Sequence, residues 1–298
     1  SISTRSCSVE DINMQKAIYQ SENKPVRVLI LELLGSEGAA HYKQIILQVQ
    51  SIRKNVPEHS VRARLSEGVL KKELARLDEG IYDIYQENEK LSSIVSYPQR
   101  GPWGDRSYRG NCSGFLIKDL ILKFRAKRVL DPAEGSGTAK DVVNGLNKFK
   151  HAKIEYVGLD LKSGFNLLKD EIKGKFDFIF FHPPYNDIIK YSECADDLSN
   201  CEDYPAFVEK LKLCTEKLHN CLDDHGVMAI LIGDTRKNGK YTPIFNDILN
   251  FRIGTLKSII IKAQHNVFSE SKSYEFGNPE KRKLFIPIMH EYCLIFQK

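Results

Sequence analysis

The chain has 298 residues, of which 42% are hydrophobic and 28% are charged, and it carries a formal net charge of +5. This is the composition of an ordinary globular chain with a sizeable core, long enough for one large domain or two smaller ones. No apolar run approaches the roughly 18 residues that a membrane span needs, so we expect no membrane partner. The mildly basic charge permits a polyanionic partner without establishing one.

The first 95 residues predict an arm and a small domain. Residues 1–24 are polar and predict a partly ordered arm. In residues 25–95, the segments "PVRVLILELL", "HYKQIILQVQSI" and "VPEHSVRARLSEGVLKKE" have helical spacing, and "LARLDEGIYDIY" predicts a hairpin with Gly80 in its turn. Three helices and a hairpin resemble a winged helix-turn-helix module, a DNA-binding fold whose third helix here carries Arg62, Arg64 and Lys71.

Residues 96–298 predict an α/β domain. A bridge rich in Gly, Arg and aromatic residues contains Trp103, and an apolar helix, "FLIKDLILKF", follows it. Short apolar strands such as "KRVLD", "IEYVGLD", "KFDFIFF" and "GVMAILIGD" then alternate with amphipathic helices. This alternation predicts a mostly parallel sheet with helices on both faces.

The first of these strands ends in a glycine-rich turn. In "RVLDPAEGSGTAKD", Asp131 ends the strand, Gly135 and Gly137 lie in the turn, and a helix follows. Glycines allow a ligand to approach the backbone closely, and the helix N-terminus offers free N–H groups. The next strand ends in Asp160, about 20 residues further on, where a carboxylate suits a ribose diol. We therefore predict a cofactor with an adenosine-like ribose, while the missing G-x-G-x-x-G and P-loop lysine argue against a nicotinamide dinucleotide and an NTPase.

A second unusual strand end lies in "KFDFIFFHPPYND". The strand is followed by His182, two prolines and Tyr185. Prolines carry no N–H donor, so they do not pair in the sheet; they stiffen the backbone where open α/β sheets bind ligands. We predict a platform there with carbonyl oxygens, a polar side chain and a ring face.

Together, "DPAEGSGT" and "HPPY" resemble the motifs of the S-adenosylmethionine-dependent amino-methyltransferases of DNA, which act on adenine N6 or cytosine N4. Further matches lie in "RGNCSGFLIKDLI", "LIGDTR" and "EYCLIFQK". The resemblance implies a Rossmann-like fold and S-adenosyl-L-methionine as the cofactor. It implies a base pocket of His182, Pro183, Pro184 and Tyr185, and cofactor contacts from Asp131, Pro132, Glu134, Gly135, Gly137, Thr138, Asp160, Asn111, Cys112 and Asn166.

Position 182 departs from that family, which has Asp, Asn or Ser there. A neutral imidazole keeps the capacity to accept a hydrogen bond from the target amino group, and Tyr185 would stack on the flipped base. His182 as a true general base is a second interpretation, and a degenerate site in a DNA-binding subunit is a third. The substitution also removes the usual indication of which base is methylated.

Three further segments have two interpretations each. Asp234 lines the target pocket or caps a helix, and Phe165 packs on the cofactor adenine or shapes a loop. Tyr191, Ser192 and Asp197 form a lid or a solvated loop. The seven cysteines contain no C-x-x-C pair, so we predict reduced thiols in a cytoplasmic protein and no metal site.

Double-stranded DNA is the predicted partner, in a bacterial or phage-type protein associated with the nucleoid. Candidate DNA contacts beyond the winged helix are Arg106 and Arg109 in the bridge, with Trp103 at a base step, and Lys262 and His265 near the C-terminus. A homodimer and a restriction endonuclease of the same system are open expectations. RNA or a protein glutamine is the alternative substrate.

Overall fold

The computed structural model describes residues 24–37, 40–71, 73–84, 91–97, 101, 103–105, 107–150, 152–186, 189–237, 239–265 and 285–298. The predicted arm, except residue 24, and the DNA contact predicted at Arg106 lie outside these ranges. The chain forms two compact units, Ser1–Asn88 and Glu89–Lys298. The boundary predicted after residue 95 would cut strand β4 (Ile94–Ser96), which pairs with β11 (Thr255–Ala263) and so belongs to the second unit.

The described residues of the first unit form three helices and a small antiparallel sheet. The helices are α2 (Val26–Glu37), α3 (Tyr42–Ile52) and α4 (Glu58–Leu70), and the sheet has the order β1-β3-β2, from Ala40–His41, Ile81–Ile84 and Leu74–Asp78. The apolar faces of the helices meet in one cluster that includes Ile30, Ile45, Val61 and Leu65. The predicted helices and hairpin are therefore present, and the two-residue strand β1 is an addition that the sequence did not indicate.

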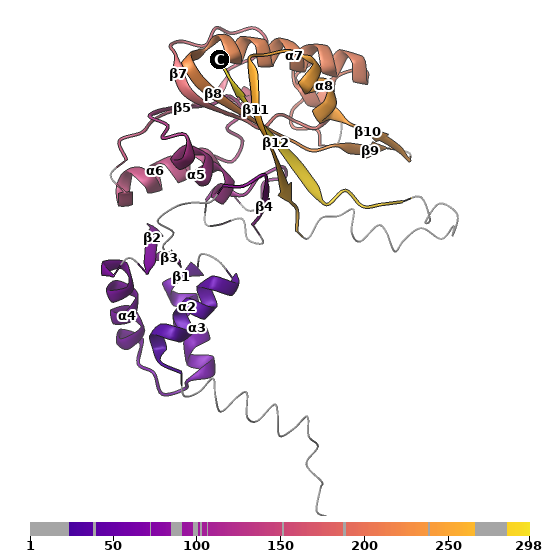
Figure 1. Ribbon diagram of the computed structural model, residues 1–298. Coiled ribbons are helices and arrows are strands. Elements are labelled where there is room, and N and C mark those ends of the chain that lie inside the picture. Colours follow the sequence, from indigo (N-terminus) through magenta and orange to yellow (C-terminus); the bar gives the residue numbers. More distant parts are fainter. Residues whose placement is uncertain are drawn as a thin grey trace, which may run out of the picture. The chain divides into compact units, whose positions relative to one another are not determined.

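The second unit is built on a seven-stranded sheet with the order β4-β11-β12-β8-β7-β5-β6 (Figure 1). The remaining strands are β5 (Arg128–Asp131), β6 (Glu155–Gly158), β7 (Phe176–Phe181), β8 (Leu222–Ile232) and β12 (His290–Gln297). All of these strands run in one direction except β12, which is antiparallel to both of its neighbours. The predicted α/β class and mostly parallel sheet are confirmed, and the unit has a Rossmann-like fold.

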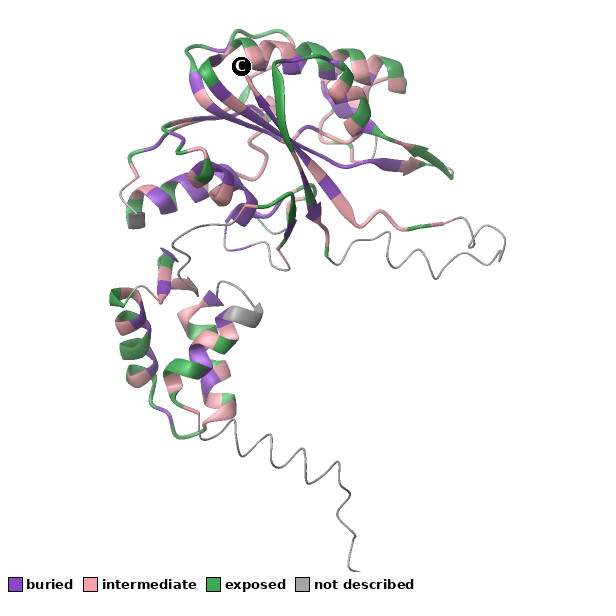
Figure 2. Cartoon of the chain, in the orientation of Figure 1, coloured by how far each residue is buried: buried purple, intermediate pink, exposed green. Residues whose placement is uncertain are grey.

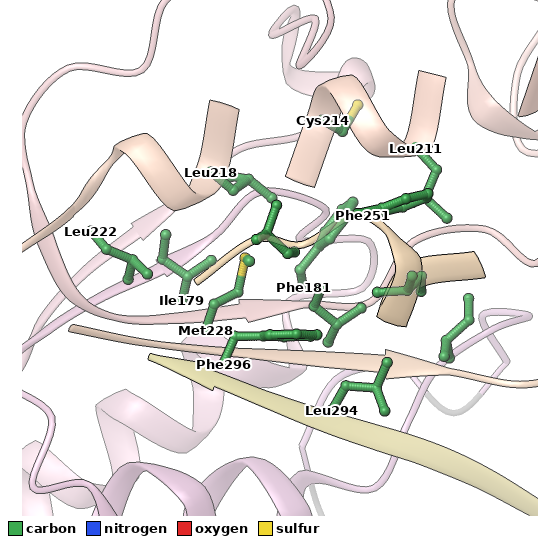
Figure 3. Close-up of a cluster of buried hydrophobic side chains, with 14 of the residues drawn as sticks. Ile179, Phe181, Leu211, Cys214, Leu218, Leu222, Met228, Phe251, Leu294 and Phe296 are labelled. Carbon is green, nitrogen blue, oxygen red and sulfur yellow. The ribbon is translucent and has the colours of Figure 1, made fainter. Parts of the chain in front are cut away.

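Helices cover both faces of this sheet. In Figure 1, α7 (Tyr204–Asn220) and α8 (Ile244–Asn250) lie on one face, and α5 (Gly114–Lys123) and α6 (Thr138–Lys150) lie on the other. Figure 3 shows how side chains from α7 meet those of the sheet, with Leu211 and Leu218 facing Phe181 and Met228. Figure 2 shows the central strands almost wholly buried, as their continuous apolar sequences predict.

Two features of the second unit were not predicted. Strand β4 extends the sheet beyond β11, and a short hairpin, β9 (Thr235–Lys237) and β10 (Lys240–Thr242), is inserted between β8 and α8. Among the described residues, the search for a helix long and apolar enough to cross a membrane found none.

Candidate active site

One pocket of about 330 Å³ receives both motifs that the sequence singled out. It opens beyond the carboxyl ends of β5, β6 and β7, where ligands bind in α/β sheets. The predicted site residues that line it are Asn111, Cys112, Asp131, Pro132, Glu134, Gly135, Thr138, Asp160, Asn166, His182, Pro183, Pro184 and Tyr185. The fold thus brings together residues that are up to 74 positions apart in the sequence, from 111 to 185.

Asp160 fastens the glycine turn to the end of the second strand. One of its carboxylate oxygens accepts a hydrogen bond from the Gly135 N–H at 2.9 Å, and the other accepts one from the Lys162 N–H at 2.9 Å. The second bond makes Asp160 the N-cap of the short helix η1 (Leu161–Ser163). Because Gly135 has a φ of +54°, its N–H is presented in a backbone conformation that favours glycine. Asp160 is therefore a structural clamp as well as a pocket wall.

The pocket wall is acidic near this turn. The pKa of Asp131 is raised to about 7, mainly by burial and also by the neighbouring carboxylates of Glu134 and Asp160, while a hydrogen bond from the Ala133 N–H opposes the rise. Among the described lining residues, six are Asp or Glu and Lys162 is the single Lys or Arg. Such a lining disfavours phosphate groups and suits a ligand with positive charge.

The segment before α5 forms another wall of the pocket. The Thr138 hydroxyl donates to the Asn111 side-chain oxygen, and the Asn111 amide donates to the Asp105 carbonyl at 3.1 Å. Cys112 is buried, and burial raises the pKa of its thiol to about 12, so it stays protonated at neutral pH. Asn111 therefore ties this segment to the first turn of α6 and lines the pocket, and its contact with the cofactor stays a prediction.

The H-P-P-Y segment carries a hydrogen-bonded series of side chains. Nε2 of His182 lies 2.9 Å from the Tyr185 hydroxyl, which donates to Glu291 Oε1 at 2.6 Å. The pKa of His182 is lowered to about 4, mainly by burial; the Glu291 carboxylate opposes this shift, and the Lys262 ammonium adds to it. His182 is thus neutral at physiological pH, as its predicted role as an acceptor requires.

Internal hydrogen bonds connect residues 191–200, the stretch that follows this segment. The buried carboxylate of Asp197 accepts hydrogen bonds from the Ser192 hydroxyl at 2.7 Å and from Ser199 at 2.8 Å (N–H) and 2.7 Å (hydroxyl). Asn200 donates to the carbonyls of Ser192 and Cys194. Tyr191, Ser192 and Asp197 line the pocket, and Asp197 is buried, so this stretch is not a solvated loop. Its role as a lid stays a prediction.

Among the pocket residues that the sequence analysis did not single out are Tyr108, Lys162, Gln264 and Glu291. The Lys162 ammonium lies 4.0 Å from the centroid of the Tyr108 ring, and that ring stacks on Tyr191 at 6.1 Å. Tyr108 lies in the bridge rich in aromatic residues, and this composition could have indicated a pocket residue. No feature of the sequence indicated Glu291, because an acidic residue near the start of a strand is common.

Three expectations need correction. Lys262, expected to contact DNA, is buried and forms an ion pair with Glu291 at 2.6 Å, so a phosphate cannot reach it. Trp103, expected at a base step, is 2% exposed and packs edge-on against Phe115. Gly137 is in the turn with a φ of +80°, but it does not line the pocket.

Asp234 serves the start of α8 rather than the pocket. Its carboxylate accepts hydrogen bonds from the Tyr241 hydroxyl at 2.5 Å and from the Phe245 N–H at 3.3 Å. It does not line the pocket. The helix-capping interpretation is therefore the better description of this residue.

The remaining predicted DNA contacts are exposed. On α4, Arg62 pairs with Glu58, and Arg64 and Lys71 both pair with Glu67. Arg109 and His265 are exposed, and His265 lies 2.9 Å from the Ser96 hydroxyl. These side chains are accessible, but glutamates of the same helix already partner those on α4.

No protein-family profile and no curated protein sequence matches this chain. A protein from Thermus thermophilus, described as a DNA modification methylase, is 23% identical over 44% of this chain and 49% of its own, with a TM-score of 0.30. A Listeria monocytogenes protein, described as a class I S-adenosylmethionine-dependent methyltransferase, is 15% identical over 95% of this chain and 84% of its own (TM-score 0.37). An N-methyltransferase from Bradyrhizobium japonicum with bound S-adenosyl-L-homocysteine is 9% identical over 65% of this chain and 89% of its own, with a TM-score of 0.33.

The chain spans about half the length of the Thermus protein. These structural neighbours are S-adenosylmethionine-dependent methyltransferases, and several hold S-adenosylmethionine or S-adenosylhomocysteine. Because the identities and TM-scores are low, we base the function of this chain on its own site.

Proposed function

We propose that this chain transfers a methyl group from S-adenosylmethionine to an exocyclic amino group of a base flipped out of double-stranded DNA. Adenine N6 is slightly favoured over cytosine N4, because it is the larger class. The observation that carries the proposal is that a single pocket is lined by both the glycine turn and the H-P-P-Y segment. Direct transfer between two bound molecules needs such a shared pocket, since positioning supplies most of the catalysis.

The lining fits this cofactor. When bound, S-adenosylmethionine supplies a methyl group activated by a positively charged sulfur, and it also carries an ammonium group. The carboxylates of Asp131 and Glu134, held close together, gain from a nearby positive charge. Each Asp160 oxygen is already bonded to one backbone N–H but retains a lone pair, which can accept a ribose hydroxyl.

The H-P-P-Y residues would hold the target base. An exocyclic amino nitrogen is a poor nucleophile, because its lone pair is delocalised into the ring. The neutral His182 would accept one amino N–H, and the backbone carbonyl of His182 or Pro183 would accept the other. This pairing draws the nitrogen toward a tetrahedral form and frees the lone pair. Flipping costs a few kcal/mol, and stacking on Tyr185 would return roughly 1–3 kcal/mol.

The arrangement of the first unit supports DNA as the proposed substrate. Its three helices, α2, α3 and α4, are followed by the hairpin β2-β3, as predicted from the sequence for a winged helix, and α4 would be its recognition helix. The ion pairs of Arg62, Arg64 and Lys71 do not exclude this role, because exposed pairs contribute only ~0–1 kcal/mol and can be exchanged for phosphates. A homodimer and a restriction endonuclease partner stay predictions.

The proposal is tested by incubating the protein with labelled S-adenosylmethionine and, in parallel, with double-stranded DNA, RNA and protein. We expect label in DNA alone. Label confined to RNA or to glutamine would assign the alternative substrate. Cofactor and duplex binding without label in any acceptor would indicate a degenerate subunit.

A further inference from the structure

Four side chains form a continuous series from the outer strands to the base pocket. The Lys262 ammonium donates to Glu291 Oε2 at 2.6 Å, and the Tyr185 hydroxyl donates to Glu291 Oε1 at 2.6 Å. The same hydroxyl lies 2.9 Å from His182 Nε2. Lys262 and Glu291 are paired directly across β11 and β12. The series therefore links the antiparallel part of the sheet to the end of β7.

Glu291 is ionised in this arrangement. Burial alone would raise the pKa of its carboxyl, but the Lys262 ammonium and the hydrogen bonds from Lys262 and Tyr185 outweigh burial, so the pKa is lowered. An O–H···O⁻ bond of 2.5–2.7 Å is the usual length for a charge-assisted bond, which matches the contact from Tyr185. The carboxylate thus accepts on both oxygens and donates nothing.

Counting protons then assigns the tautomer of His182. Tyr185 has one hydroxyl proton, and that proton is engaged by Glu291. Toward His182, the Tyr185 oxygen can only accept, so His182 Nε2 must carry the ring proton. In a neutral imidazole the other nitrogen, Nδ1, is then an acceptor.

That second nitrogen is available to a ligand. Within the described part of the chain, Nδ1 of His182 has no hydrogen-bond partner, and it is not among the fully buried atoms that lack one. His182 itself lines the pocket. Nδ1 is therefore an unpaired acceptor that is not fully buried, on a side chain that lines the pocket.

We infer that Glu291 is a positioning residue: by holding the Tyr185 proton, it fixes His182 in the tautomer that presents Nδ1 as a hydrogen-bond acceptor to the substrate. Lys262 keeps Glu291 charged and in place. That the substrate group is an amino N–H rests on the proposed function, whereas the tautomer does not.

The tautomer can be measured without any substrate, by ¹⁵N nuclear magnetic resonance of the histidine-labelled protein at pH 7. The His182 signal is identified by its loss in His182→Asn. We expect protonation at Nε2. In Lys262→Met/Glu291→Leu, the ion pair is replaced by apolar side chains, a change that is often tolerated. Tyr185 would then donate to Nε2, and the ring proton would move to Nδ1.

Protonation at Nδ1 in the parent, or at Nε2 in both proteins, would overturn the inference. If the double variant does not fold, the same resonance measurement on Tyr185→Phe tests whether the Tyr185 hydroxyl fixes the His182 tautomer. This substitution removes only a hydroxyl, so the ring proton should distribute over both nitrogens. An unchanged, single Nε2-protonated state in Tyr185→Phe would also overturn the inference.

Kinetics supply an independent readout. We expect kcat of the double variant to fall between about 10-fold and 10⁴-fold, the larger figure being the loss caused by a wrong histidine tautomer in a serine protease. The KM for the cofactor should stay within about twofold. Tyr204→Phe is the matched control, since it also removes a tyrosine–carboxylate bond, to Asp247, but outside the pocket. It should keep the parent kcat.

The two proposals can fail separately. Parent-like kcat in the double variant, with the tautomer moved, would overturn the role of Glu291 in presenting the acceptor. If the parent transfers no methyl group at all, the proposed function fails, and the resonance measurement alone decides the arrangement of the protons.

Discussion

Replacement of Asp160 by alanine should damage both the fold and the cofactor site. The change leaves the N–H groups of Gly135 and Lys162 without their acceptor and removes the N-cap of η1. A lost N-cap costs ~1 kcal/mol, and an unpaired donor costs roughly 1–3 kcal/mol where water cannot replace the acceptor. The two costs add up to about 2–4 kcal/mol, and we expect the loss in the free energy of unfolding at the lower end of this range, because water can partly reach both groups.

This loss is measured by thermal unfolding without ligand, where each kcal/mol lowers Tm by about 2–4 °C in a domain of this size. Calorimetry of the folded variant should then show S-adenosylmethionine bound about 5- to 150-fold more weakly, which corresponds to roughly 1–3 kcal/mol. Asp203→Ala is the matched control, because Asp203 caps α7 through the Ala206 N–H and does not line the pocket. It should lose stability and keep cofactor affinity.

Two results would refute the reasoning about Asp160. An Asp160→Ala variant with parent stability would show that the clamp between the glycine turn and η1 contributes nothing. A destabilised but folded variant with parent affinity would make Asp160 a cap alone and would remove it from the cofactor site.

Three further predictions concern the turn, the first unit and His182. Gly137→Val should lower the free energy of unfolding by at least ~1–2 kcal/mol in thermal unfolding, because its φ of +80° is strained for a β-branched residue; unchanged stability would contradict this. Removing residues 1–88 should weaken DNA binding and flatten its salt dependence while cofactor affinity persists; an unaltered salt slope would assign that unit another partner. The rate of methyl transfer should fall only as the pH approaches about 4, where His182 protonates, and His182→Asn should not show this fall. A pH–rate profile of the parent with its midpoint near 6.5 would contradict the lowered pKa of His182. The pKa of His182 is about 6.5 in the unfolded chain and about 4 in the folded one, so protonation favours unfolding as the pH falls. Between pH 7 and pH 5, the free energy of unfolding of the parent should therefore fall by about 2 kcal/mol more than that of His182→Asn.

The sequence predicted features that depend on local pattern. Strand β7 was expected from Phe176 to Phe181 and is found there, because a continuous apolar run next to two prolines leaves little choice. The turn after Asp131 and the platform after Phe181 were placed at neighbouring strand ends, since parallel strands bring their carboxyl ends to one edge. The shared pocket follows from that topology.

The pairing of residues across neighbouring strands could not be predicted from the sequence. Lys262 was expected to contact DNA because it lies in a segment rich in basic residues near the end of a predicted strand. Its burial depends on the register that sets it opposite Glu291, 29 residues later, and no local pattern encodes that register. For the same reason the link from Glu291 to Tyr185 and His182 was not predicted.

Trp103 was misjudged because of an assumption about composition. A segment rich in Gly, Arg and aromatic residues was expected to contact nucleic acid. Its tryptophan instead packs against Phe115 and close to Gly101 and Gly114, where an added Cβ would clash with the ring. The glycines there make room for a core side chain, and only the exposed Arg109 is left as a described candidate contact from that segment.

The central claim is that the His182 pocket methylates an amino group of a DNA base. The most direct measurement is mass spectrometry of nucleosides from duplex DNA incubated with the protein and S-adenosylmethionine carrying a deuterated methyl group, alongside His182→Leu. We predict deuterated N6-methyladenine, or N4-methylcytosine, with the parent, and none with His182→Leu, although that variant still binds the cofactor. Equal methylation by both proteins, or no labelled nucleoside with a parent that binds cofactor and DNA, would contradict the claim.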